Sequence, residues 1–275
     1  MTSVTEAIRA AHAKLAETSD TARLDAELLM AYALGVSRSD MLLGHMHQSV
    51  PEGFAALIKR RAAHEPVAYI TGLQEFFGRD FAVGPGVLIP RGDSEILIEA
   101  ALEEAPPLPR VIDLGTGSGA LLVTALLELE GASGVGVDAS FEAIRFASTN
   151  ALRHGVLGET VRFVEASWAK PDWALDMGRF DLVLCNPPYV EEGVHLEPDV
   201  RDFEPASALF AGAEGLADYR RLIPQLREMM KEDAVAIFEI GHMQADAVTA
   251  VAHNSGFEVQ LRMDLAGRPR CLVLR

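Results

Sequence analysis

The chain has 275 residues, of which 49% are hydrophobic and 23% are charged, and its formal net charge is −16. This length allows one large domain or two smaller ones, and the composition excludes a disordered or collagen-like chain. The acidic surplus argues against tight binding to nucleic acid, because such binding depends largely on basic side chains that cover phosphates.

The sequence has no pattern typical of a secretory leader, a membrane span or a metal site. Its N-terminus lacks a basic start followed by an apolar block, and charged residues interrupt every apolar stretch well before about 18 residues. The two cysteines, Cys185 and Cys271, lack metal-ligand spacing and fit reduced thiols. We therefore expect a cytoplasmic protein that does not enter a membrane and binds no metal.

Residues 1–75 are predicted to form a small helical domain. Ser3 and Glu6 have the spacing of a capping box, and the apolar residues that follow recur at helical intervals. Each expected helix is too short to be stable alone, so the apolar faces are expected to pack together as a bundle. The expected helices cover residues 4–15, 24–35, 40–46 and 54–63.

Residues 76–275 are predicted to form a hairpin linker followed by an α/β domain. Short β-like pieces at 69–70, 75–77 and 81–83 are separated by glycines, which favours a hairpin. Further on, strands alternate with helices of 10–15 residues, which implies a doubly wound, Rossmann-like parallel sheet covered on both faces. The expected helices cover 94–104, 119–130, 141–154, 216–230 and 243–254; the expected strands cover 110–113, 134–137, 161–164, 180–185, 234–239, 257–263 and 270–274.

A glycine-rich loop is expected at the turn between the first strand and first helix of this α/β alternation. Glycines let the backbone approach a ligand closely, and an acid that ends the next strand, Asp138, can accept hydrogen bonds from ribose hydroxyls. The loop also satisfies the dinucleotide pattern, so by itself it fits NAD(P) or S-adenosylmethionine. Asp113 favours the cationic S-adenosylmethionine over a pyrophosphate. The loop and its leading acid comprise Asp113, Gly115, Thr116, Gly117, Ser118 and Gly119.

A second motif, Asn186-Pro187-Pro188-Tyr189, follows the fourth strand of this alternation. The two prolines stiffen the loop and lack N–H donors, so the loop offers acceptors: the Asn186 side-chain oxygen and the Pro187 carbonyl. Two acceptors suit a planar NH₂ group whose lone pair must be turned toward an electrophile, with Tyr189 supplying a flat face. The alternative is a rigid turn in which Asn186 caps its own backbone.

With both motifs in place, the chain resembles the N-P-P-Y class of S-adenosylmethionine-dependent amino-methyltransferases. Within that class it closely resembles the PrmC/HemK family, which methylates the glutamine amide of the Gly-Gly-Gln motif in peptide chain release factors. The resemblance spans nearly the whole sequence. Besides the two motifs it is carried by RRAAHEPVAYITG at 60–72, EFFG at 75–78, LIPRGDSE at 88–95, RDFEP at 201–205, ALFAG at 208–212, EGLADY at 214–219, EIGHMQ at 239–244 and DLAGR at 264–268.

The resemblance implies a seven-stranded methyltransferase domain that binds S-adenosylmethionine, releases S-adenosylhomocysteine and needs no metal. It implies that Asp113, residues 115–119 and Asp138 hold the cofactor, and that Trp168 lies near the adenine. Residues 186–189 would bind the glutamine amide, and Asn186 would contact the cofactor as well. The partner would be a class I release factor, recognised by the helical domain. Two departures are Ser167, which is often acidic in relatives, and Gly92 with Ser94 in a run that usually reads Pro-Arg-Pro-Asp-Thr-Glu.

Four other functions remain open at this point. The N-P-P-Y motif also serves adenine-N6 methylation of nucleic acid, against which the net charge of −16 weighs. A sister family methylates a glutamine of a ribosomal protein, although Asp93-Ser94-Glu95 favours the release-factor branch. The glycine loop alone would allow an NAD-dependent oxidoreductase or a non-enzymatic cofactor-binding adaptor.

Glu204, in the long loop after the substrate motif, is a candidate for ordering that loop over the site.

Overall fold

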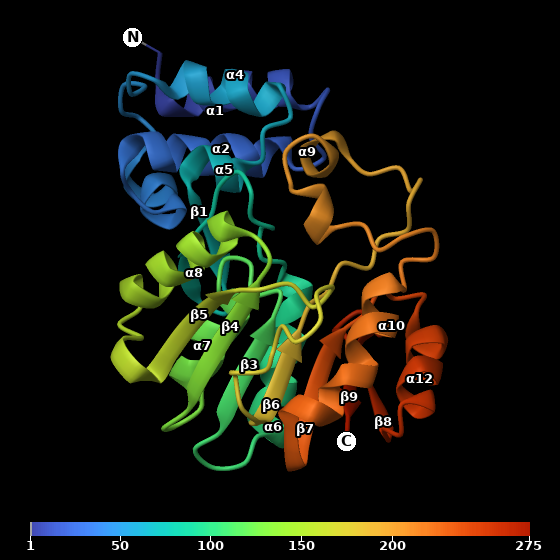
Figure 1. The fold of residues 1–275 in the computed structure, drawn as a ribbon. Helices are drawn as coiled ribbons and strands as arrows, with labels where there is room; N and C mark the ends of the chain where they lie inside the picture. Colours follow the sequence, from blue (N-terminus) through green and yellow to red (C-terminus); the bar gives the residue numbers. More distant parts are fainter. Residues whose placement is uncertain (1) are drawn as a thin grey trace. The chain divides into compact units, whose positions relative to one another are not determined.

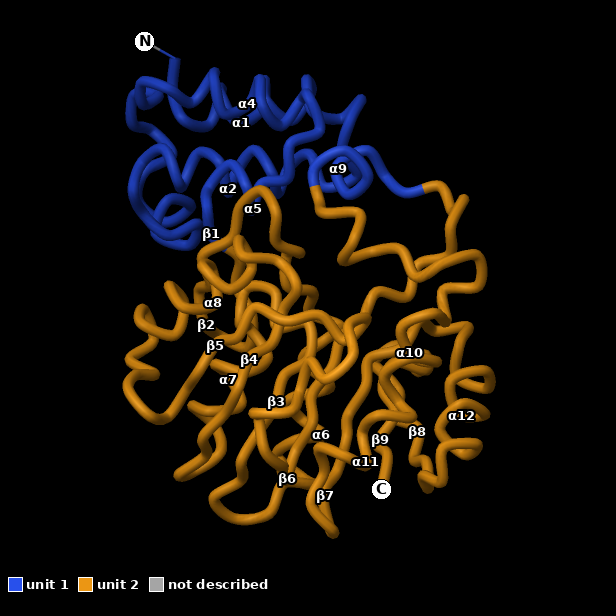
Figure 2. The backbone as a smooth tube through the Cα atoms, in the orientation of Figure 1, with its two compact units in different colours: residues 1–73, 196–203 blue, residues 74–195, 204–275 orange. Residues whose placement is uncertain are grey.

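The computed structural model describes residues 2–275 and divides into two compact units (Figures 1 and 2). Unit 1 comprises the chain up to Leu73 together with Leu196–Phe203, and unit 2 comprises Gln74–His195 and Glu204–Arg275. The sequence predicted a single division at residue 75. The segment Leu196–Phe203 departs from that prediction, because its side-chain partners lie far back in the sequence: Asp199 pairs with Arg61 at 3.5 Å.

Unit 1 is a bundle of short helices around one apolar core. The capping box is confirmed: Ser3 N donates to Glu6 Oε2 at 2.8 Å and Glu6 N donates to Ser3 Oγ at 3.3 Å. Ile8, Leu15 and Leu29 are fully buried, as expected for the inner faces of amphipathic helices. The helices are α1 Val4–Leu15, α2 Ala22–Leu34, α3 Arg38–Asp40 continued by a π-helix over Met41–His45, α4 Phe54–Ala62, α5 Val67–Thr71 and α9 Pro198–Arg201.

The predicted hairpin is present, as β1 Leu73–Phe76 and β2 Arg79–Ala82. The prediction of β structure at residues 69–70 is wrong, because these residues lie in α5. Pro66 precedes the first helical position, and Gly72, with a φ of +76°, ends the helix in the left-handed conformation. Phe76 and Phe81 from the hairpin are buried in the core of unit 2.

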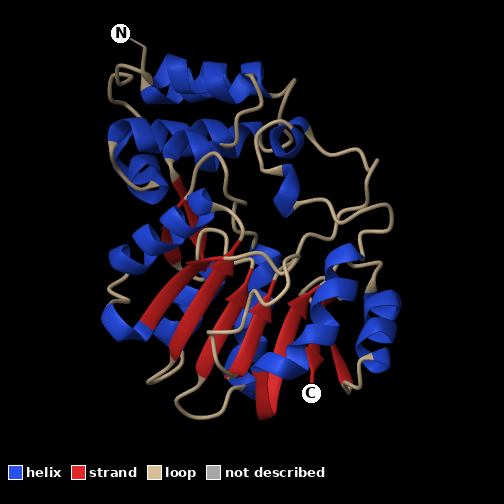
Figure 3. Ribbon diagram, viewed as in Figure 1, coloured by secondary structure: helices blue, strands red, loops and turns tan. Residues whose placement is uncertain are grey.

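Unit 2 is built on a seven-stranded sheet, so the doubly wound fold is confirmed (Figure 3). Its first five strands in spatial order pair in parallel, whereas β9 pairs antiparallel with both neighbours. The sequence predicted a parallel sheet throughout; β8 and β9 depart from it because the few residues between them allow only a hairpin. The order is β5 Val161–Glu165, β4 Ser133–Asp138, β3 Arg110–Leu114, β6 Phe180–Cys185, β7 Met230–Glu239, β9 Pro269–Leu274 and β8 Val259–Met263.

Helices cover both faces of this sheet and bury two apolar cores. One core lies under α6 Glu95–Glu104, α7 Ala120–Glu128 and α8 Phe141–Arg153, and the other under α10 Ala217–Leu222, α11 Leu226–Met229 and α12 Ala245–Asn254. The single helix expected over 216–230 is interrupted by a 3₁₀ turn, because Pro224 has no N–H to donate and its ring clashes with the preceding turn. Within residues 2–275, no helix combines the length and the apolar character needed to cross a membrane.

Candidate active site

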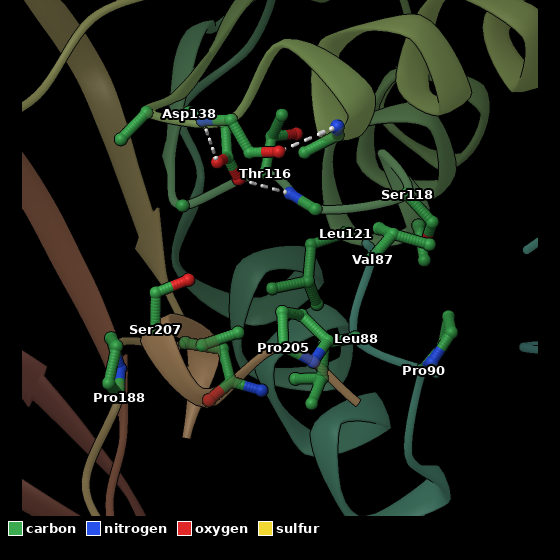
Figure 4. A pocket seen from close by; sticks show the side chains of 18 of the residues that line it. Val87, Leu88, Pro90, Thr116, Ser118, Leu121, Asp138, Pro188, Pro205 and Ser207 are labelled. Atoms are coloured by element: carbon green, nitrogen blue, oxygen red, sulfur yellow. Dashed lines mark hydrogen bonds between the residues drawn. The ribbon is translucent and has the colours of Figure 1, made fainter. Parts of the chain in front are cut away.

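A cavity of about 380 Å³ opens at the carboxyl ends of β3, β4 and β6 (Figure 4). Ligands of doubly wound folds bind at this edge, because the loops that follow parallel strands gather there. Eight of the predicted site residues line the cavity, from the loops after β3, β5 and β6 and from the end of β4. They are Gly115, Thr116, Gly117, Ser118, Asp138, Trp168, Asn186 and Pro188.

The glycine loop adopts backbone conformations that side chains disfavour. Gly115, Gly117 and Gly119 have φ angles of +77°, +54° and +81°. Gly119 does not line the cavity; a Cβ on it would lie 3.0 Å from the Ala147 Cα atom, so glycine permits close packing against α8. The N–H groups of Gly115 and Thr116 donate to the Val137 carbonyl at 2.8 and 2.9 Å, which ties the loop to the end of β4.

Asp138 ends β4 and faces the cavity beside the glycine loop (Figure 4). Its carboxylate accepts from Gly117 N and from Ser140 N, both at 2.9 Å. Burial raises the pKa of Asp138, and these backbone donors partly oppose the rise. Because each carboxylate oxygen can accept more than one hydrogen bond, Asp138 can still bind ribose hydroxyls.

Asp113 lies beneath the glycine loop and does not line the cavity, in contrast to the placement that the sequence suggested. It is fully buried, and its Oδ2 accepts from Thr116 Oγ1 at 2.7 Å. Burial raises the pKa of Asp113 to about 7, despite the hydrogen bond from Thr116 and with a further contribution from Asp138. Within the described residues 2–275 its Oδ1 atom has no hydrogen-bond partner. A fully buried acid next to this cavity favours a ligand that brings a positive charge.

Trp168 lines the cavity from the loop after β5. Its indole Nε1 donates to Asp218 Oδ1 at 2.7 Å, which fixes the plane of the ring. The ring packs against the glycine loop, since a Cβ on Gly115 would lie 3.3 Å from it. Ser167 does not line the cavity; its hydroxyl accepts from Ala169 N at 3.3 Å.

The N-P-P-Y motif divides between the cavity and the interior. Asn186 and Pro188 line the cavity, whereas Pro187 is buried and the Tyr189 hydroxyl donates to the buried Glu239 at 3.2 Å. Burial and the neighbouring charge of Glu239 raise the pKa of Tyr189, so its hydroxyl stays protonated. The Asn186 Nδ2 group donates to Ser94 Oγ at 3.2 Å.

Two further loops complete the cavity, and the sequence analysis had suggested only the second of them, through Glu204. The first contributes Val87, Leu88, Pro90 and Arg91, and the second contributes Pro205, Ser207 and Ala208. Glu204, buried at 6% exposure, joins them: its carboxylate accepts from Ile89 N at 3.0 Å and pairs with Arg91. This geometry agrees with the hypothesis that Glu204 orders the loop. The first loop carried no chemical signal of its own, because it contributes mainly apolar side chains and backbone.

The Glu204→Ala variant is expected to bind cofactor roughly tenfold more weakly, since it leaves the buried Ile89 N–H without its acceptor and removes the partner of the partly exposed Arg91, which loosens both loops. Calorimetric titration with S-adenosylmethionine measures the effect. The matched control is Glu214→Ala, because Glu214 is exposed and its ion pair is with the exposed Arg220. Equal affinities for the Glu204 variant and this control would show that the carboxylate does not order the cavity.

Comparison with known proteins identifies the family. Residues 6–72 match the PrmC N-terminal domain, and residues 92–208 match the methyltransferase small domain. The release factor glutamine methyltransferase of Geobacter sulfurreducens is 40% identical over 86% of this chain and 84% of its own length. The chain belongs to the release factor glutamine methyltransferase family. The member of this family from Nitratidesulfovibrio vulgaris is likewise 40% identical, over 93% of this chain and 89% of its own length.

A solved structure, the ribosomal protein L11 methylase of Lactobacillus delbrueckii subsp. bulgaricus, is 28% identical with a TM-score of 0.50, over 70% of this chain and 83% of that one. The family assignment implies S-adenosylmethionine as the cofactor, which supplies an electrophilic methyl group. The cavity fits this cofactor, because its lining combines exposed glycine backbone, an acid at the end of β4 and an aromatic ring. Among residues 2–275, no group of three or more His, Cys, Asp or Glu side chains is placed to hold a metal ion.

Proposed function

We propose that this protein transfers the methyl group of S-adenosylmethionine to the side-chain amide nitrogen, N5, of the glutamine in the Gly-Gly-Gln motif of class I release factors. The observation that carries the proposal is the placement of Asn186. Its side chain lines the cavity, and its Nδ2 end is engaged by Ser94, so its Oδ1 end is available to accept from a substrate. The family membership of the chain supports the choice of substrate.

The cofactor residues divide by chemistry. The glycine loop, residues 115–119, would accommodate the amino-acid part of the cofactor, with Asp113 behind it. Asp138 would accept from the ribose hydroxyls, and Trp168 would lie beside the adenine. S-adenosylhomocysteine is the expected product, and no metal ion takes part.

The substrate amide would be held by two acceptors, the Asn186 Oδ1 atom and the Pro187 carbonyl. Each would accept one N–H of the glutamine NH₂ group, which turns the nitrogen face toward the methyl group. As the lone pair leaves conjugation to form the new bond, the N–H groups become more acidic and these hydrogen bonds strengthen. The residues therefore stabilise the transition state more than the bound substrate, and the extra proton leaves after transfer.

Recognition of the release factor is assigned to unit 1, which contains the residues that match the PrmC N-terminal domain. Methylation is expected in the cytoplasm, in line with two free, buried cysteines. The acidic net charge of −16 supports a protein substrate over nucleic acid.

The test incubates the protein with isotopically labelled S-adenosylmethionine and, separately, an intact release factor, a short Gly-Gly-Gln peptide, ribosomal proteins and duplex DNA. Mass spectrometry is expected to place one added methyl on the glutamine of the release factor, with higher kcat/KM for the intact factor than for the peptide. If only DNA or only a ribosomal protein becomes labelled, the proposed substrate is wrong. If kcat/KM is equal for the intact factor and the peptide, unit 1 has no role in recognition.

A further inference from the structure

A buried carboxylate, Glu239, contacts the substrate motif from behind the cavity wall. Glu239 ends β7 and is 1% exposed. Its Oε2 atom accepts from Ser94 Oγ at 2.5 Å and its Oε1 atom accepts from Tyr189 OH at 3.2 Å. Ser94 in turn accepts from Asn186 Nδ2 at 3.2 Å. Glu239 therefore connects to both polar side chains of the motif, although it does not line the cavity itself.

The direction of these hydrogen bonds follows from a count of protons. An ionised carboxylate only accepts, so Ser94 must use its single hydroxyl proton to donate to Glu239. The Ser94 oxygen is then left with lone pairs alone, and the Asn186 group next to it must be the NH₂ end. The opposite end of the amide, Oδ1, consequently points away from Ser94.

The surroundings of Glu239 supply what an ionised carboxylate needs. Burial raises the pKa of Glu239, and the nearby charge of Asp93 adds to the rise; the hydrogen bond from Ser94, the charge of Arg270 and the hydrogen bond from Tyr189 oppose it. Arg270 is itself 8% exposed, so its charge is poorly screened by water, and it pairs with Asp93 at 2.8 Å. Each carboxylate oxygen of Glu239 accepts from one hydroxyl, which is the arrangement that the ionised form requires.

We propose that Glu239, acting through Ser94, is a positioning residue that fixes which end of the Asn186 amide faces the substrate. Without this relay the side-chain amide of Asn186 can rotate so that its NH₂ and oxygen exchange places. The rotated amide presents two N–H donors to a substrate NH₂ group that itself needs acceptors. The rotated amide cannot hold the substrate productively. The inference deepens the proposed function, on which it rests, by explaining why a serine hydroxyl and a buried acid stand behind the motif.

The kinetic test is a double-mutant cycle between Ser94 and Asn186. Ser94→Ala is expected to lower kcat roughly 10- to 100-fold, because a misplaced catalytic group costs rates of this order, with the cofactor Kd little changed. Ser94→Thr, which keeps a hydroxyl, is expected to restore most of the loss. In an Asn186→Ala background, Ser94→Ala should change kcat less than about twofold, since the group it orients is gone.

Glu239→Gln is expected to lower kcat as Ser94→Ala does, because a neutral amide no longer dictates the direction of the relay. The matched control is Glu232→Gln, an exposed acid on the same strand. A drop in kcat from Ser94→Ala that is equally large with and without Asn186 would overturn the proposal. So would full kcat in Glu239→Gln with a normal unfolding midpoint.

A readout that needs no substrate separates this inference from the proposed function. The Asn186 side-chain NH₂ gives an NMR signal that is identified by its loss in Asn186→Ala. In the unaltered protein we expect slow exchange of this group with water, and in Ser94→Ala and Glu239→Gln faster exchange or a shifted signal. If the exchange rate of the Asn186 NH₂ is the same in the variants as in the unaltered protein, the relay is overturned, whatever substrate is methylated. If the NH₂ exchanges slowly in the unaltered protein but release factor is not methylated, only the proposed function is overturned.

Discussion

The Asn186→Ala variant is expected to lose turnover on release factor by roughly 10²- to 10³-fold, while its cofactor affinity stays within a few-fold of the unaltered protein. The size follows from removing an acceptor whose hydrogen bond strengthens as the glutamine nitrogen is methylated. Cofactor affinity is preserved because the glycine loop, Asp138 and Trp168 are untouched and Asn186 contributes one of many lining groups. Single-turnover kinetics and calorimetry with S-adenosylmethionine measure the two quantities separately.

The control for this variant is Asn254→Ala, a substitution of the same type at the exposed end of α12. It should change neither quantity. A result in which Asn186→Ala keeps full turnover would contradict the assigned role of the amide oxygen. A loss of cofactor binding as large as the loss of turnover would instead make Asn186 a cofactor residue, and the acceptor assigned to the substrate would then have to be sought elsewhere.

The chemistry of the motif could be predicted from sequence, whereas the orientation of its side chains could not. A stiff loop of acceptors after a strand follows from Asn186 and two prolines. The partner that orients Asn186 is Ser94, which lies 92 positions earlier in the chain. The partner of Ser94 is Glu239, which lies 145 positions after Ser94. The order of strands brings Asn186 and Glu239 together, because β7 lies next to β6 in the sheet, and Ser94 comes from the 3₁₀ turn that precedes α6.

The same distinction applies to the fold. Most strands and helices of unit 2 could be predicted because a strand shows as a short apolar run and a helix as a longer segment, and because glycines or acids follow several of them, as Gly115 follows β3 and Asp138 ends β4. The short helix α5 was missed because a run of four apolar residues allows either period, and Pro66 with Gly72 decided the outcome. The segment Leu196–Phe203 packs within unit 1 against residues far earlier in the chain, as Asp199 does beside Arg61, and the local sequence gives no signal of such a contact.

The Asp113→Asn variant is expected to remove a large pH dependence of stability. Burial raises the pKa of Asp113 from 3.8 to about 7, so the folded protein holds this proton more tightly than the unfolded chain does. Above pH 4 the unfolded chain releases the proton first, and the free energy of unfolding falls as the pH rises toward 7. A shift of about 3 pH units corresponds to a loss on the order of 4 kcal/mol, which asparagine avoids.

Urea unfolding of the cofactor-free protein at pH 5 and pH 8 measures this effect. The free energy of unfolding of the unaltered protein should fall between pH 5 and pH 8. In Asp113→Asn this fall should be smaller. Asp246→Asn, at an exposed position of α12, serves as the control and should leave the fall unchanged. Identical pH dependence in the Asp113 variant and the unaltered protein would show that the carboxyl ionises normally.

The raised pKa of Asp113 also predicts how the cofactor binds. A sulfonium and an ammonium group brought to the glycine loop favour the ionised form of Asp113, so binding near pH 6 should release a proton and tighten as the pH rises toward 7. Calorimetry in two buffers with different heats of ionisation detects the released proton, and Asp113→Asn should release none. An acid that destabilises the free protein at neutral pH would thus contribute affinity once a cation is bound beside it. Proton release that persists undiminished in the asparagine variant would assign this role to another group.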